Sequence, residues 1–211
     1  MNDDHLLTQK RSLLAALLIH VPFDGWTSKA LAQAAKDCGY DAGLVARIFP
    51  EGAVEALEFW VAETDAAMLH ALESRDLMAM KIRERVKAAV MTRLELVAPH
   101  REAVRRALTL EALPYHAPRA LRQLYRTVDA IWYAAGDTAT DFNFYTKRML
   151  LAGVYAATLM HWLDDRSEGF ASTAAFLDRR LSDVMRIQSA KGKVGKLFER
   201  LPSPLRGMRR V

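Results

Sequence analysis

The stretch that decides the fold is DAIWYAAGDTATDFNFYTKRMLLAGVYAATLMHWLDD, residues 129–165. It predicts two helices joined by a short polar turn, because Gly136 suits a left-handed helix C-cap and the turn offers several N-cap side chains. Those N-cap candidates are Asp137, Thr138, Thr140 and Asp141. The second helix contains an uncharged segment, residues 149–163, and a helix that is apolar on every side must be covered on every side. The segment is shorter than the about 20 residues of a membrane span. Its cover is therefore the rest of the fold, a partner subunit or an apolar ligand, with a central core helix as the first expectation.

Composition and charge describe a soluble globular chain with an uneven charge distribution. The chain has 211 residues, 51% of them hydrophobic and 26% charged, and a single cysteine, Cys38, which fits a reducing compartment. Residues 1–76 hold 6 Lys/Arg against 12 Asp/Glu, a net charge of −6. Residues 77–185 carry +4, and residues 186–211 carry +7. The N-terminal third is therefore acidic and the C-terminal segment strongly basic.

Apolar residues recur at helical spacing along the chain, and no segment alternates as a strand would. Helices are predicted over residues 6–21, 29–39, 44–49, 53–74, 81–97, 100–113 and 119–135, around 149–163, and over 174–189. The sequence PFDGW predicts a turn after the first helix, and Thr27 or Ser28 is expected to cap the second. The chain is therefore predicted to be all-α, with about nine helices.

The N-terminal part reads as a helix-turn-helix, because two short helices flank a turn that contains Gly39. Its pattern resembles the N-terminal domain of TetR-type regulators, which bind DNA with the third helix. The residues that carry the resemblance are Trp26-Thr27, Leu31-Ala32, Ala35, Gly39-Tyr40, Leu44, Ile48-Phe49-Pro50 and Leu57. The third helix nevertheless offers one cation, Arg47, and no side chain that reads base edges. With the region's charge of −6, we expect no specific DNA binding.

No catalytic or metal motif is present in the sequence. A Glu-x-x-His pair, a His-x-x-x-His pair, a G-x-S-x-G elbow and a Walker loop are all absent. We interpret His161 as a satisfied core or interface histidine. The pair Asp164-Asp165 is interpreted as a solvated helix end, and Asp129, Asp137 and Asp141 as capping and turn residues. The sequence therefore predicts a protein that is not an enzyme and holds no metal.

A second resemblance covers roughly the whole chain. The motif comprises Ile131-Trp132-Tyr133, Ala135-Gly136-Asp137, Thr140-Asp141-Phe142-Asn143 and Tyr145-Thr146 to Arg148. It is similar to the signature of the TetR-like, lipid-binding accessory protein of ubiquinone (coenzyme Q) biosynthesis, the ninth protein of that set. The segment Phe176-Leu177-Asp178-Arg179-Arg180 fits the same family.

The resemblance implies a non-enzymatic homodimer without a cofactor that binds an isoprenoid or phospholipid ligand. It would present an isoprenoid quinone precursor to a membrane-associated hydroxylase, which docks on Trp132 and Tyr133. Mitochondrial members carry an N-terminal targeting sequence that this chain lacks, so we expect a bacterial cytoplasmic protein, peripheral to the inner membrane. Two alternatives are a TetR-type regulator with a lipophilic effector and an all-α interaction dimer without a ligand.

The residues themselves add two observations. Aromatic side chains are favoured interface anchors, and on its helix Tyr133 lies on the polar side while Trp132 lies at the edge of the apolar stripe, where it could also be a core residue. In the C-terminal segment, apolar and basic positions separate as they do in helices that lie on anionic membranes. The expected membrane-contact residues are Lys193, Val194, Lys196, Leu197, Phe198, Arg200 and Leu201. A solvated tail that folds back on the protein is the alternative.

The predicted organisation has three parts: a helix-turn-helix-like part (1–52), a lipid-binding and dimerisation domain (53–190) and a membrane-contacting tail (191–211). A water-insoluble ligand requires an enclosed apolar cavity that keeps a few polar groups. We expect its walls to come mainly from two helices, with one residue from an earlier helix. The expected lipid-binding residues are Leu94, Leu121, Tyr125, Val128, Leu150, Leu151, Val154, Tyr155 and Thr158.

Overall fold

The computed structural model describes residues 2–137 and 142–184. Those residues form helices and connecting turns with no strand, which confirms the all-α prediction. The helices are α1 (Asn2–Asp24), α2 (Ser28–Asp37), α3 (Ala42–Ile48), α4 (Ala53–Glu73), α5 (Ile82–Val97), α6 (Arg101–Glu111), α7 (Ala117–Ala134) and α8 (Phe142–Asp164). Residues 171–184 form a final helical segment. Short 3₁₀ turns lie at Leu77–Ala79, Ala98–His100 and Glu168–Phe170.

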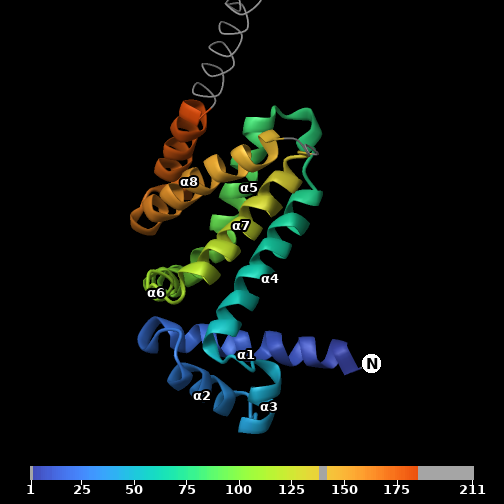
Figure 1. Cartoon of the computed structure of the whole chain (residues 1–211), viewed down its shortest axis with the longest axis vertical. Coiled ribbons are helices and arrows are strands. Elements are labelled where there is room, and N and C mark those ends of the chain that lie inside the picture. The colour runs from blue at the N-terminus through green and yellow to red at the C-terminus, as the bar shows by residue number, and fades with distance from the viewer. Residues whose placement is uncertain (1, 138–141, 185–211) are drawn as a thin grey trace, which may run out of the picture.

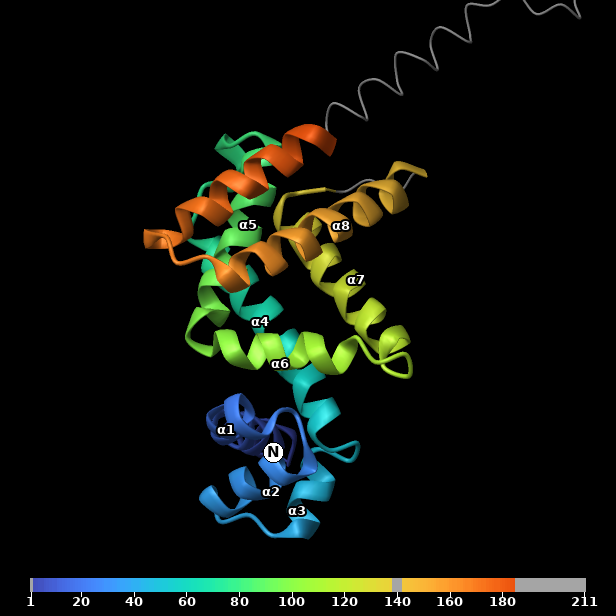
Figure 2. The ribbon, with the colours of Figure 1, turned by 90° about the vertical axis from the view of Figure 1, so that its left-hand side faces the viewer.

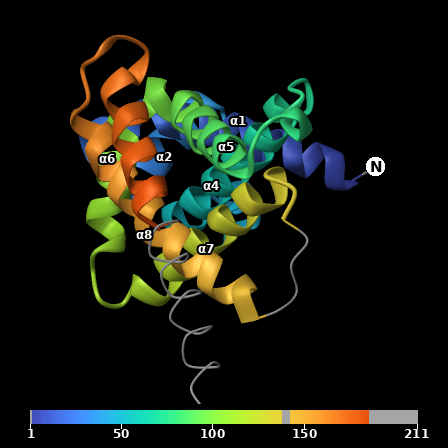
Figure 3. The ribbon, with the colours of Figure 1, turned by 90° about the horizontal axis from the view of Figure 1, so that it is seen from above.

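The helices form two groups that share the long helix α4. Figure 1 shows α1, α2 and α3 at one end of the molecule, with α4 running from this group into the larger one. Helix α6 crosses between the groups and packs against α1 (Figure 2). Seen from above (Figure 3), α4, α5, α7 and α8 lie close together, and α4 packs on both α5 and α7 while α7 packs on α8. The larger group is therefore a bundle closed at one end by α6.

Local capping explains the short N-terminal helices. The hydroxyl of Thr27 accepts a hydrogen bond from the backbone N–H of Ala30, which confirms Thr27 as the cap of α2. Asp41 caps α3 in the same way. The predicted turn at PFDGW begins later than expected, because α1 continues through Pro22 to Asp24. Pro22 has the φ that a helix requires but no backbone N–H to donate, and its carbonyl oxygen accepts a hydrogen bond from Arg106.

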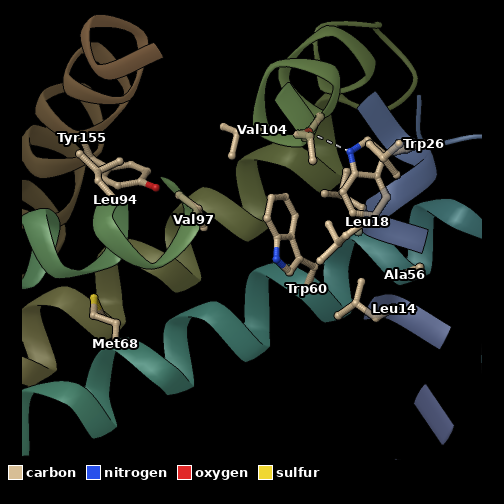
Figure 4. Close-up of a cluster of buried hydrophobic side chains, with 14 of the residues drawn as sticks. Leu14, Leu18, Trp26, Ala56, Trp60, Met68, Leu94, Val97, Val104 and Tyr155 are labelled. Carbon is tan, nitrogen blue, oxygen red and sulfur yellow. Dashed lines mark hydrogen bonds between the residues drawn. The ribbon is translucent and has the colours of Figure 1, made fainter. Parts of the chain in front are cut away.

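Two tryptophans join the two groups of helices. The rings of Trp26 and Trp60 lie 5.4 Å apart between centroids, and the indole N–H of Trp26 donates to the carbonyl oxygen of Ala103 at 3.0 Å. These side chains come from the α1–α2 connection, α4 and α6, and all three residues are buried (Figure 4). A buried Trp normally finds a partner for its N–H, so this bond fixes the position of α6 over α1.

The described residues do not cover helix α8 on every side, which differs from the central core helix expected from its uncharged sequence. Its inner face is buried through Leu151, Val154, Tyr155 and Trp162. Its outer face exposes apolar and small residues, namely Met149, Gly153, Ala157 and Met160. Residues 2–137 and 142–184 therefore cover about half of this helix and leave its outer face exposed.

The buried carboxylate of Asp165 lies shortly before the final helical segment, where a solvated helix end was predicted. Asp165 is buried and accepts four hydrogen bonds, from the backbone N–H and the hydroxyl of both Ser167 and Thr173, whereas Asp164 is exposed. Burial alone would raise the pKa of Asp165, but these bonds outweigh burial and hold the pKa well below its ordinary value of 3.8. The interpretation of both residues as a solvated helix end is therefore wrong for Asp165.

Candidate functional site

A cavity of about 430 Å³ lies inside the larger group of helices. Its volume falls within the range of small-molecule sites in proteins. Five helices and the α6–α7 turn contribute to its mainly apolar wall, and most of the wall comes from α4, α6, α7 and α8. The lining residues are Leu57, Trp60, Val61, Thr64, Arg93, Val97, Val104, Ala107, Leu108, Glu111, Ala112, Ala117, Ala120, Leu121, Gln123, Leu124, Thr127, Tyr155, Ala156, Leu159 and Met160.

The cavity has a mouth between α7, α8 and the α6–α7 turn. Among its lining residues, Ala112, Ala117, Leu121 and Met160 are exposed. Leu121 is 63% exposed and Met160 58%, which is high for apolar side chains of this size. The turn beside the mouth also exposes Leu113 and Tyr115. An apolar ligand that enters here passes an apolar rim.

A buried polar network forms one wall of the cavity. The guanidinium of Arg93 donates to a carboxylate oxygen of Asp65 at 2.7 Å and to the phenolic oxygen of Tyr155 at 2.6 Å. The hydroxyl of Thr127 donates to the second oxygen of Asp65 at 2.9 Å. Burial would lower the pKa of Arg93, but Tyr155 and Asp65 together raise it, so the guanidinium stays charged. Because Asp65 balances that charge, the network ties α4, α5, α7 and α8 together with no net charge.

One further charge on the cavity wall has no partner. Glu111 is half-buried at the last residue of α6, and it receives no hydrogen bond and no ion pair from residues 2–137 or 142–184. Burial raises the pKa of its carboxyl group, Arg93 acts in the opposite direction, and Glu58 raises the pKa further. A negative charge at the C-terminal end of a helix is also unfavourable for the helix dipole. Three unfavourable features therefore meet at this side chain.

Trp132 and Tyr133 lie at the end of α7, on a surface that ion pairs with α8 hold in place. Tyr133 is 75% exposed, and Trp132 is half-buried with the ammonium of Lys147 at 5.7 Å from its ring. Arg148 of α8, which is buried, pairs with Asp129 at 2.6 Å, and Lys147 pairs with Asp137 at 2.8 Å. Asp129 lies inside α7 and not at a cap or turn, so that part of the interpretation is wrong, whereas Asp137 lies in the turn after α7 as interpreted. Both carboxylates are ion-paired and hold α8 against the end of α7.

Arg85 fixes the other side of this surface. Its guanidinium donates to the carbonyl oxygens of Met78, Met80 and Ala135 at 3.0, 2.9 and 3.1 Å. Gly136 follows with φ of +78°, as predicted for the C-cap, and an added Cβ there would lie 3.2 Å from Arg85 and Met78. The turn before α5 is therefore held against the end of α7.

The chain is similar in sequence to known proteins, and the similarity includes α7 and α8. A sequence profile of the COQ9 family matches residues 117–188, which include α7, the signature and α8. The mitochondrial ubiquinone biosynthesis protein COQ9 of Rattus norvegicus is 34% identical over 202 residues, which cover 92% of this chain and 64% of that protein. COQ9-B of Xenopus laevis is 32% identical over 206 residues, which cover 94% of this chain and 70% of that protein.

The chain belongs to the COQ9 family.

The relatives that the chain matches are named as ubiquinone biosynthesis proteins. The chain spans about two thirds of the length of its mitochondrial relatives, for example 63% of COQ9 from Homo sapiens. Its fold is TetR-like, since the crystal structure of a TetR transcriptional regulator from Nitrosomonas europaea matches it with a TM-score of 0.68. That match covers 83% of this chain and 97% of the regulator at 20% identity. The predicted family and fold are both confirmed.

The structure of this COQ9 protein places the expected lipid-binding residues in three positions. Leu121 and Tyr155 line the cavity. Five others are buried but do not line the cavity, namely Leu94, Val128, Leu151, Val154 and Thr158, and Thr158 donates to the carbonyl oxygen of Val154. Tyr125 is exposed and Leu150 half-buried, and neither lines the cavity. Helix α6 and the inner face of α4 complete the wall instead, and lipid binding by these residues remains a prediction.

Several expectations lie outside the described residues. The seven membrane-contact residues of the tail and the N-cap candidates Thr138, Thr140 and Asp141 belong to this group. Among the described residues, no helix combines the length and the apolarity that a bilayer crossing requires. His161 of this COQ9 protein is satisfied as interpreted, because its ring stacks on Phe176 at 4.5 Å and contacts the hydroxyl of Ser172. Residues 2–137 and 142–184 contain no cluster of His, Cys, Asp or Glu side chains that could hold a metal ion.

Proposed function

We propose that this COQ9 protein is a non-enzymatic carrier that holds an isoprenoid lipid in its cavity and presents it to a hydroxylase of the quinone pathway. The observation that carries the proposal is the mainly apolar cavity of about 430 Å³ with its exposed apolar mouth at Leu121 and Met160. Each CH₂ of a lipid tail that enters such a cavity contributes about 0.8 kcal/mol. A prenyl chain therefore binds firmly, and a membrane is the equally apolar acceptor into which it is released.

The decisive experiment is to fill the cavity. Ala156 lies on its wall in α8 and is half-buried, so Ala156→Trp places an indole where the ligand would lie. The matched control is Ala62→Trp, at an exposed alanine of α4 that does not line the cavity. Organic extraction and mass spectrometry should recover less prenyl lipid from the first variant than from the second. Equal yields from both variants would place the lipid elsewhere, and no lipid from the unchanged protein would refute the proposal.

The hydroxylase is proposed to dock on Trp132 and Tyr133. Tyr133 is exposed, and the pairs Arg148–Asp129 and Lys147–Asp137 hold its surroundings in one arrangement. Rigid aromatic side chains on an ordered surface are typical anchors of protein interfaces. This position also lies on α7, whose first turns line the lipid cavity, so one helix connects the docking surface with the ligand.

A homodimer is proposed to cover the outer face of α8. The exposed residues Met149, Gly153 and Ala157 recur at every fourth position along one side of this helix, and the small residues among them allow close approach of a second helix. Light scattering at micromolar concentration should give twice the monomer mass, and Ala157→Arg should reduce it to the monomer. A monomeric unchanged protein would refute the dimer.

A further inference from the structure

The cavity contains a polar feature that a carrier of apolar chains does not require. A simple apolar pocket would have a leucine where Glu111 stands, because a half-buried carboxylate without a partner is unfavourable. The same side chain ends α6, where the helix dipole opposes a negative charge. The protein retains a charged acceptor at the cavity wall although the described fold gives it no donor.

The charges around the cavity determine what this acceptor can bind. Arg93 and Glu111 are the only Lys, Arg, Asp or Glu side chains among the lining residues, and Asp65 pairs with Arg93 at 2.7 Å from behind. Arg119 and Glu58 lie nearby, and Arg119 pairs both with Glu58, at 2.9 Å, and with Glu51. The wall therefore carries one unbalanced negative charge, which belongs to Glu111. An anionic head group would meet repulsion here, whereas a hydroxyl group would find a strong acceptor.

We propose that Glu111 is the head-group residue of the cavity: its carboxylate accepts a hydrogen bond from the hydroxyl of an uncharged lipid and disfavours lipids with an anionic head. This inference rests on the proposed function, because it assumes that the cavity binds a lipid. The ligand class is an uncharged prenyl chain that ends in an alcohol or a phenol. Fatty acids and phosphorylated prenyl chains of the same length are disfavoured.

The test is a competition between lipids that differ only in the head. Farnesol, its methyl ether and farnesyl phosphate are presented in equal amounts in phosphatidylcholine vesicles, and the lipids that remain with the purified protein are quantified by mass spectrometry. A hydrogen bond to a charged group corresponds to about tenfold or more in affinity. We therefore expect the unchanged protein to retain farnesol over its methyl ether, and over the phosphate, by about tenfold.

Two substitutions separate the hydrogen bond from the charge. Glu111→Leu removes both, so farnesol and its methyl ether should be retained equally. Glu111→Gln keeps an acceptor but removes the charge, so the preference for farnesol over the ether should remain while retention of the phosphate rises. Glu95→Gln, at an exposed position of α5 away from the cavity, is the matched control and should change none of these ratios. None of the three variants should lower the thermal stability, because Glu111 receives no bond from the described residues and Glu95 is exposed. Glu111→Leu should raise it slightly, because it removes a half-buried carboxylate.

The outcomes distinguish this inference from the proposed function. If the unchanged protein retains none of the three probes, the lipid-carrier function itself is refuted. If it retains all three without preference, the cavity binds lipid and the role of Glu111 is refuted. The same conclusion follows if the preference for farnesol survives in Glu111→Leu, or if the phosphate gains nothing in Glu111→Gln.

Discussion

Separating the buried pair of Asp65 and Arg93 should destabilise the protein far more than removing it whole. Arg93 is 6% exposed and Asp65 is 8% exposed, so neither charge can turn to water when its partner is lost. Removing one member of such a pair costs about 3–5 kcal/mol. For a chain of this size each kcal/mol lowers the Tm by about 2–4 °C. Arg93→Met alone or Asp65→Leu alone should therefore lower the Tm by about 6–20 °C.

The double variant Asp65→Leu/Arg93→Met removes both charges and leaves an apolar contact of similar volume. It should be more stable than either single variant. Two neighbours still lose a partner, since Thr127 donates to Asp65 and Tyr155 accepts from Arg93. Each lost hydrogen bond costs about 0.5–1.5 kcal/mol, so the double variant should remain about 1–3 kcal/mol less stable than the unchanged protein.

Chemical denaturation of all four proteins measures the coupling between the two positions. The two single costs should exceed the double cost by several kcal/mol, because each single variant leaves an uncompensated charge. If the costs of the single variants simply add in the double variant, the network does not hold the cavity wall as described.

Four further results follow from the structure. The carboxyl groups of Asp165 and Asp178 have lowered pKa values in the folded state, through hydrogen bonds to the former and through Lys87 and Arg83 for the latter. Their contribution to stability is therefore complete above about pH 4 and is lost as the pH falls below it. Chemical denaturation between pH 6 and pH 2 should show that Asp165→Asn loses less free energy of unfolding on acidification than the unchanged protein does. Tyr133→Ala should leave the Tm unchanged and abolish capture of the hydroxylase in a pull-down. Trp132→Ala should abolish capture and also lower the Tm, because that ring is half-buried. Full quinone hydroxylation in cells that carry Tyr133→Ala would contradict the docking role. Gly153→Ala should weaken the proposed dimer, because Gly153 lies on the face that a partner helix would cover closely. An added Cβ meets no atom within 4 Å among the described residues of the same chain, so a gain in stability of about 0.5–1 kcal/mol with the dimer intact would contradict that packing. Gel shifts at physiological salt should detect no sequence-selective DNA binding. A selectively bound DNA site would contradict this expectation, which rests on the net charge of −6 over residues 1–76.

The helices of this protein could be predicted because their signals are local. Apolar spacing, the cap at Thr27 and the left-handed Gly136 depend on residues a few positions apart, and the structure places helices where these signals indicate. The family signature also identified the end of α7. Boundaries were less certain, as the continuation of α1 through Pro22 shows.

The polar residues of the cavity could not be predicted, because their meaning depends on distant partners. Asp65 meets residues 28 and 62 positions away, and no local pattern records such a contact. A weaker signal was present: Asp65 and Arg93 are charged residues on helix faces that are otherwise apolar, and such charges are buried only when paired. Glu111 offered no signal, because a charge near a helix end is usually solvated. Likewise, the uncharged sequence of α8 indicated burial on every side, whereas the described residues bury only its inner face.

The contact between Trp26 and Trp60 gives the N-terminal helices a thermodynamic connection to the cavity. Trp60 lines the cavity, and its ring packs on Trp26, which is bonded in turn to α6. A ligand that binds only the folded state stabilises every segment that must unfold before the ligand is released. Amide hydrogen exchange in α1 and α2 should then slow when the cavity fills, although neither helix touches the ligand. The helix-turn-helix part, for which we expect no specific DNA binding, would then stabilise the wall of the cavity through this contact.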